Sequence, residues 1–155
     1  MNNQELVAFL GIKFSGKLTN ITSPREKRIF VEVATADLVN VMQTLKDSGI
    51  DFLGTITGLD LRDKFEVIYH LYNDEGIVVN VKTFTERNNP KVPTVTTVFA
   101  GAFLYERELM DLLGIDVEGT PPHRRYPLPD DWPAGQFPLR KDWKGLPSED
   151  EVNKV

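Results

Sequence analysis

Carboxylates and a guanidinium lie close together on one expected helix. Glu106, Glu108 and Asp111 fall within a short stretch, and paired carboxylates are the groups that general acid and base catalysis uses. Arg107 precedes Asp111 by four residues, a spacing that favours a local ion pair on a helix. Successive residues such as Glu106 and Arg107 also point in different directions. We therefore interpret the cluster as structural or as part of an interface.

Other candidates for metal binding or proton transfer are few. Asp60 and Asp63 flank the end of an expected strand, but without calcium-loop spacing they favour turn chemistry, as does the pair that begins at Asp130. His70 lies in a strand pattern, which favours a packed or edge side chain. His123 precedes two arginines, where a metal-binding or proton-transfer role is disfavoured. No serine has a recognisable base partner, and no glycine-rich loop resembles a phosphate-binding motif. The residues predict no catalytic centre.

Basic and large apolar residues alternate near the C-terminus. Arginine pairs carboxylates in a bidentate manner and stacks on aromatic rings. A mixture of arginine and aromatic residues is typical of interface anchors, and we favour this interpretation over a solvated basic tail. The residues concerned are Arg124, Arg125, Tyr126, Leu128, Trp132, Leu139, Arg140 and Lys141.

The composition changes after Gly119. Seven of the ten prolines lie between Pro121 and Pro147, where they exclude helices and central strands. Fully extended, such a segment reaches on the order of 100 Å, whereas the domain before it is roughly 35 Å across. We predict a globular domain at residues 1–118 and an extended, partner-binding segment at residues 119–155, which we call the tail.

Hydrophobic periodicity predicts an α+β domain with two layers. Apolar residues recur at helical spacing in residues 35–49 and at a spacing of two in residues 28–33, as amphipathic helices and half-buried strands require. Residues 72–76 are expected to join two strands as a hairpin. We expect a mostly antiparallel or mixed five-stranded sheet with helices on one face. The expected helices are residues 3–11 and 35–49, followed by a helical region that opens at residues 93–94, breaks near Gly101 and resumes at residues 102–113. The expected strands are residues 14–22, 28–33, 52–59, 65–71 and 77–84.

Bulk composition excludes several classes of function. The chain of 155 residues has a net charge of −5, which argues against nucleic-acid binding. It contains no cysteine, so it has no disulfide, no thiolate nucleophile and no cluster bound by its own thiolates. No apolar stretch approaches the length of a membrane span, and the N-terminal residues lack the features of a secretory signal. We expect contact with a membrane only through a partner.

The helix and the tail together resemble one known family. The motifs are an E-R-E-x-x-D helix, a G-I pair, an R-R-x-x-L-P segment and a closing P-L-R-K-D, and they span residues 106–142. This pattern is similar to that of the 30 kDa (C-type) subunit of respiratory complex I, NADH:quinone oxidoreductase, and of homologous subunits of energy-converting membrane-bound nickel–iron hydrogenases. The family's usual Gly-His-Pro-Asp is replaced here by Gly119-Thr120-Pro121-Pro122. Leu113 stands where an aromatic residue is common.

The resemblance implies a non-catalytic hydrophilic assembly subunit in the peripheral arm of a membrane-bound redox complex. Such a subunit docks on the large hydrogenase-like (49 kDa type) subunit beside a neighbouring Fe–S subunit, and supports electron transfer coupled to ion translocation. It implies no cofactor on this chain, with FMN, Fe–S or NiFe groups only in partner subunits. The implied location is peripheral, on the cytoplasmic side of the membrane. The alternatives are the equivalent subunit of a hydrogenase or related dehydrogenase, a stand-alone adaptor, and a small enzyme that uses the helix carboxylates and His123.

The resemblance also assigns roles to residues. Glu106, Arg107 and Asp111 are expected to order the docking helix, and the charged residues of the tail are expected to pair with the large subunit. The full set expected at the partner is Glu106, Arg107, Glu108, Asp111, Arg124, Arg125, Tyr126, Trp132, Pro138, Leu139, Arg140, Lys141 and Asp142.

Overall fold

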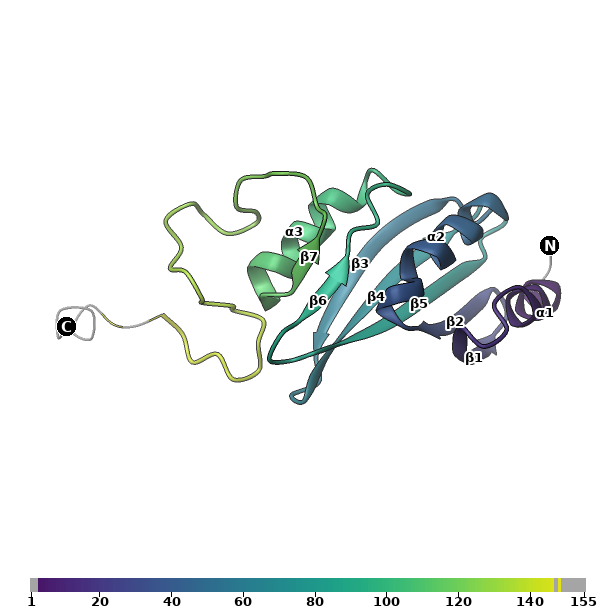
Figure 1. Cartoon of the computed structure of the whole chain (residues 1–155), viewed down its shortest axis with the longest axis horizontal. Coiled ribbons are helices and arrows are strands. Elements are labelled where there is room, and N and C mark those ends of the chain that lie inside the picture. Colours follow the sequence, from purple (N-terminus) through teal and green to yellow (C-terminus); the bar gives the residue numbers. More distant parts are fainter. Residues whose placement is uncertain (1–2, 147, 149–155) are drawn as a thin grey trace.

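The computed structural model describes residues 3–146 and residue 148. A globular domain precedes an irregular segment that loops out beside the last helix, at the opposite end of the molecule from α1 (Figure 1). The elements are α1 (Asn3–Lys13), β1 (Leu18–Arg25), β2 (Arg28–Val33), a 3-10 turn (Thr35–Asp37), α2 (Leu38–Asp47), β3 (Phe52–Asp60), β4 (Lys64–Tyr72), β5 (Val78–Glu86), β6 (Lys91–Pro93), α3 (Ala102–Leu113) and β7 (Asp116–Glu118).

The main sheet is mixed and has five strands in the order β1-β2-β5-β4-β3. Neighbouring strands are antiparallel except β2 and β5, which run parallel. The expected hairpin joins β4 to β5, and Tyr69 lies opposite Val81. The fold is therefore the α+β arrangement that the sequence predicts.

Alternation along β4 gives the sheet one buried face. Phe65, Val67 and Tyr69 are fully buried, and Gly58 of β3 lies opposite Val67 on the same face. A side chain added at Gly58 would meet Leu113 Cδ1 at 2.4 Å and Leu109 Cδ2 at 2.7 Å. The glycine is therefore what allows α3 to pack directly on the sheet. Figure 1 shows α2 lying across the same sheet.

Two short strands lie on either side of the last expected helical region. The prediction of helix from residue 93 is wrong, because Lys91–Pro93 forms β6 and pairs in parallel with β7, whereas the expected resumption of helix at Ala102 is confirmed. The segment between β6 and α3 contains only turns, one closed by the Phe99 N–H donating to the Val95 carbonyl at 2.8 Å and the next by the Ala102 N–H donating to the Phe99 carbonyl at 2.9 Å. Periodicity misses such short strands, since they are shorter than the window over which a period is visible.

The N-terminal boundaries also differ from expectation. α1 continues through Gly11 to Lys13, and the Phe14 N–H still bonds the Leu10 carbonyl at 3.0 Å. Phe14 is buried, so core packing overrides the expected glycine stop and delays β1 to Leu18. Among the described residues, no helix combines the length and the apolar character that crossing a bilayer requires.

Candidate partner interface

Helix α3 carries the E-R-E-x-x-D motif and ends where the sequence predicts. Leu109 and Leu113 are buried against the sheet, which directs the charged residues towards other faces. Gly114 adopts φ 71°, and its N–H bonds the Met110 carbonyl at 3.1 Å. This left-handed C-cap ends the helix and places the first residues of β7 beside β6.

Glu106 is bound inside the protein. Its side chain is 0% exposed, and its two oxygens accept hydrogen bonds from the Val95 N–H and the Thr94 hydroxyl, both at 2.7 Å. Burial raises the pKa of Glu106, and these two hydrogen bonds oppose the rise only in part. The expected contact between Glu106 and a partner therefore needs correction, because a fully buried carboxylate makes no direct external contact. It fixes the segment before α3 instead.

Arg107 holds the start of the tail. Its guanidinium lies 5.3 Å from the ring centroid of Phe103 and 5.2 Å from that of Tyr126. It also donates a hydrogen bond to the Arg124 carbonyl. Two rings and a carbonyl thus fix one arginine, an arrangement that its planar group favours.

Asp111 holds the tail one turn further along α3. It accepts a hydrogen bond from the Leu128 N–H at 3.2 Å and lies 3.7 Å from Arg125 Nε. Arg125 also donates to the Trp132 carbonyl. The expected ion pair between Arg107 and Asp111 is therefore replaced, in the described structure, by separate contacts from each residue to the tail.

The middle of the tail is ordered around two indoles. The ring centroids of Trp132 and Trp143 lie 6.2 Å apart. Gln136 accepts from both, since Trp132 Nε1 donates to its carbonyl at 2.8 Å and Trp143 Nε1 donates to its side-chain oxygen at 2.9 Å. Both indole N–H groups are thereby satisfied without an external acceptor.

The closing P-L-R-K-D motif, residues 138–142, returns to the end of α3. The Leu139 N–H donates to the Leu112 carbonyl at 3.0 Å, and Arg140 Nε donates to the Leu113 carbonyl at 2.7 Å. Carbonyls in the last turn of a helix lack intrahelical partners, and cations are favoured there. The Arg140 guanidinium also lies 5.2 Å from the Phe65 ring centroid.

On the side of the sheet, Asp60 binds the closing motif through hydrogen bonds. It is 4% exposed, and it accepts from the Lys141 N–H at 2.8 Å, the Arg62 N–H at 2.7 Å and Arg87 Nη1 at 2.5 Å. Burial alone would raise the pKa of Asp60, but these donors outweigh it and the pKa is lowered. Arg87 bonds Asp142 with its other terminal nitrogen at 2.8 Å, so it bridges the core and the tail.

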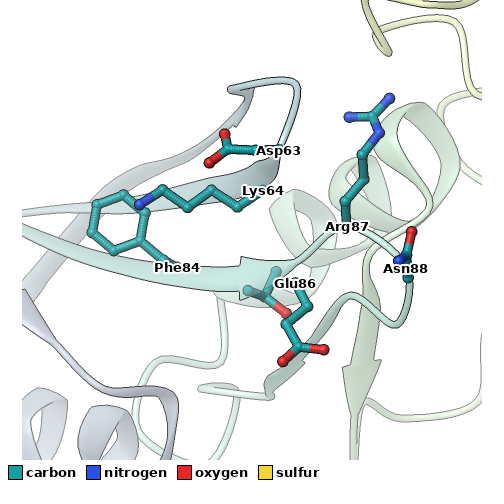
Figure 2. Close-up of a pocket in the computed structure, with 7 residues that line it drawn as sticks. Asp63, Lys64, Phe84, Glu86, Arg87 and Asn88 are labelled. Carbon is teal, nitrogen blue, oxygen red and sulfur yellow. The ribbon is translucent and has the colours of Figure 1, made fainter.

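A shallow hollow of about 530 Å³ lies beside this bridge. Figure 2 shows Lys64 lying along the ring of Phe84, with Arg87 turned away from both. Lys64 Nζ lies 4.3 Å from the ring centroid. Charged side chains of both signs line the hollow, among them Asp63, Lys64 and Glu86.

The remaining expected residues are spread over the surface. Arg124 and Lys141 are exposed, Glu108 and Pro138 are half-buried, and Leu139 is 56% exposed. The rings of His123 and Phe103 meet edge-on, with centroids 6.0 Å apart and an interplanar angle of 73°. Among residues 3–146 and 148, no group of three histidine, aspartate or glutamate side chains is placed to hold a metal.

Sequence reasoning missed Asp60 and Arg87 as determinants of the tail. Asp60 is spaced as a turn residue, and Arg87 lies in a polar stretch between strands. Neither position carries a local pattern, because the tail partners are distant in the sequence. Arg87 bonds Asp142, which is 55 residues away, and Asp60 accepts from the Lys141 N–H, which is 81 residues away. Only the sheet, which brings the ends of β3 and β5 together, makes the pairing visible.

The chain is similar to a family of respiratory subunits in both sequence and fold. The profile of the family described as "Respiratory-chain NADH dehydrogenase, 30 Kd subunit" matches residues 31–149. The chain is 33% identical to the C-type subunit of the F(420)H(2) dehydrogenase of Methanosarcina mazei, with 100% of each chain covered. It is 38% identical to the fused C/D subunit of the NADH-quinone oxidoreductase of Phocaeicola vulgatus, where the match covers 73% of this chain but only 22% of that one. A chain of the membrane-bound sulfane sulfur reductase, an archaeal respiratory membrane complex, has the same fold, with a TM-score of 0.82, 27% identity, and 92% of this chain and 86% of that chain covered.

Proposed function

Because this chain belongs to the family of the 30 kDa subunit of respiratory-chain NADH dehydrogenase, we propose that it is a non-catalytic assembly subunit of a membrane-bound redox complex. In this proposal it docks on the large, hydrogenase-like subunit of the 49 kDa type, beside an Fe–S subunit, on the cytoplasmic side of the membrane. It carries no cofactor of its own, and flavin and clusters belong to its partners. Its contribution to electron transfer is to hold those partners in register.

The observation that carries the proposal is the ordered segment beside α3. Large apolar side chains remain exposed on α3 and on this segment: Leu104 of α3 by 49%, and Tyr126 and Leu139 of the segment by 39% and 56%. Exposed aromatic and aliphatic groups fixed in position are typical of surfaces that bind another protein. Catalysis by this chain lacks such support, since two of the three helix carboxylates, Glu106 and Asp111, are committed to structural contacts.

The fused relative supports a large partner. In Phocaeicola vulgatus the matched segment is about a fifth of a longer chain, whose name joins the letters C and D. A domain that is fused to a second subunit in one organism is expected to contact that subunit where the two are separate. This favours the subunit of D type, rather than an unrelated acidic protein, as the docking partner of the tail.

The type of complex follows from the family description. That description names an NADH dehydrogenase, and the relative matched along its whole length is a dehydrogenase subunit. Membership in a nickel–iron hydrogenase, the alternative raised by the sequence, is not favoured by these matches. We therefore propose a complex of the dehydrogenase type.

Co-purification tests the proposal. The tagged chain is expected to bring down a large subunit and an Fe–S subunit, and Trp132→Ala is expected to reduce their recovery about thirtyfold, equivalent to about 2 kcal/mol for an interface anchor. Ile12→Ala is the matched control, because Ile12 is 81% exposed on α1 at the opposite end of the molecule. Turnover by the purified chain alone, or recovery of a single acidic protein without redox subunits, would contradict the proposal.

A further inference from the structure

We propose that the domain contains a binding site for the closing segment of its own chain, residues 138–142. The site is formed by Asp60, Arg87, Phe65 and the C-terminal end of α3. Its occupant fixes the tail at a second point, so residues 119–142 form a loop held at both ends before any partner binds. The inference rests on the proposed function and deepens it in one respect: the partner meets a pre-formed loop.

The charges at this site are balanced within the chain. Asp60 and Asp142 share Arg87, whose side chain is 19% exposed, while that of Asp60 is 1% exposed. The hydrogen bond to Asp60 is the main cause that raises the pKa of Arg87, which therefore stays charged. Without the closing segment, Asp60 would lose the donor at Lys141 and Arg87 would lose Asp142. A largely buried ion pair that loses hydrogen-bond partners is destabilised, so the site favours its occupied state.

The second wall of the site is the end of α3. Gly114 closely approaches the segment, since a Cβ there would lie 2.6 Å from the Phe137 ring and 2.7 Å from an Arg140 nitrogen. The Arg140 guanidinium lies 4.5 Å from the Phe137 ring centroid. Two carbonyls of the last helical turn accept from the segment. The contact is therefore built from backbone, ring and ion-pair interactions together, which fixes both position and orientation.

The first point of attachment lies earlier on α3. Arg107 holds Tyr126, and Asp111 holds Arg125 and the Leu128 N–H. Between the two attachments the loop contains Trp132 and its partner Gln136. Fixing a binding loop in advance reduces the conformational entropy that association must remove.

This arrangement divides the charged tail residues into two functional groups. Arg125, Arg140 and Asp142 hold the loop to its own domain. Arg124 and the Lys141 side chain are exposed and face outward for a partner. Changes in the first group should weaken assembly through a loosened loop, and changes in the second through lost contacts.

Hydrogen exchange on the isolated full-length chain tests the site. In the wild type, the amides of Lys141 and Leu139 are expected to exchange at least tenfold more slowly than in an unstructured peptide of the same sequence. Asp60→Asn is expected to remove most of that protection. Asp63→Asn is the matched control, because Asp63 is exposed three residues away and its replacement should leave protection unchanged.

A substitution in the tail distinguishes loss of the binding site from a folding defect of the domain. Asp142→Asn leaves the domain intact and removes the bridge to Arg87, so it should increase exchange at Lys141 and cleavage by trypsin after Arg140. Far-UV circular dichroism should remain unchanged in that variant. Peptide-like exchange of residues 139–141 in the wild type, or protection as strong as the wild type's in both Asp60→Asn and Asp142→Asn, would overturn the inference. Either result would leave co-purification with redox subunits, and so the proposed function, untouched.

Discussion

At the scale of single residues, the charged motif on α3 acts mainly within the chain. Glu106 fixes the segment before the helix, Arg107 fixes the start of the tail, and Asp111 fixes Arg125. A signature of this kind is easily read as a catalytic or docking centre, since its residue types suit both. The burial and the hydrogen-bond partners of these residues indicate a structural role instead, because the three charged residues make three different contacts within the chain.

Replacing Glu106 tests its structural role. Glu106→Ala leaves the Val95 N–H and the Thr94 hydroxyl buried without an acceptor, and is expected to lower the free energy of unfolding by about 2 to 3 kcal/mol. Glu106→Gln keeps an acceptor oxygen and is expected to cost less than about 1 kcal/mol. Urea denaturation at pH 7 measures both values. Equal losses in the two variants would show that the hydrogen bonds are not the cause.

The pH dependence of Glu106 has a definite sign. Burial raises the pKa of Glu106 in the folded protein above the ordinary value of 4.5. The part of the unfolding free energy that depends on protonation of Glu106 is therefore fully present below pH 4.5, and it is lost as the pH rises through the higher native pKa. Glu106→Gln is therefore expected to flatten the decline in unfolding free energy between pH 4 and pH 7, compared with the wild type.

At the scale of elements, α3 depends on a glycine in the neighbouring strand. Gly58→Ala places a methyl group against Leu109 and Leu113, and overpacking of this kind is expected to cost about 1 to 3 kcal/mol. Gly11→Ala is a matched control, because it lies inside α1 with its nearest neighbour at 4.0 Å. There the same substitution should stabilise by about 0.5 to 1 kcal/mol. Thermal denaturation that ranks the two variants in the opposite order would contradict this account.

The elements also show how far the sequence could be read. α2, strands β2 to β5 and the stop of α3 at Gly114 were predictable from apolar patterning or from a glycine cap. β1 was expected, but its burial pattern shows no alternation and its start was misplaced. β6 and β7 have three residues each, which is too short to show a period. The tail contacts were not predictable either, since Asp60 and Arg87 are defined only by the folded sheet. The partner-binding roles of Arg124, Tyr126, Trp132 and Lys141 stay predictions.

At the scale of the whole molecule, the tail and the domain should separate at acid pH. The donors around Asp60 lower its pKa below the ordinary value of 3.8, and the hydrogen bond from Arg87 lowers that of Asp142. The stabilising contribution is therefore present above that value and is lost as the pH falls through the lowered native pKa values. Both tryptophans lie in the tail, so their fluorescence reports this release selectively.

We expect tryptophan anisotropy to fall on acidification below pH 4 before far-UV circular dichroism changes. In Asp60→Asn the anisotropy is expected to be low already at neutral pH, with a weaker dependence on acid. A single coincident transition for both probes in the wild type would show that the tail and the domain unfold as one unit.

The position of β5 has a consequence for synthesis. This strand lies between β2 and β4 and pairs with both, although β2 leaves the ribosome long before it. The hairpins β1–β2 and β3–β4 can form early, but neither can join the other until Glu86 has emerged. Such non-local pairing slows folding and leaves the open side of β2 able to recruit foreign strands during translation. A nascent chain stalled before residue 78 should therefore depend on chaperones, whereas one stalled beyond residue 120 should not.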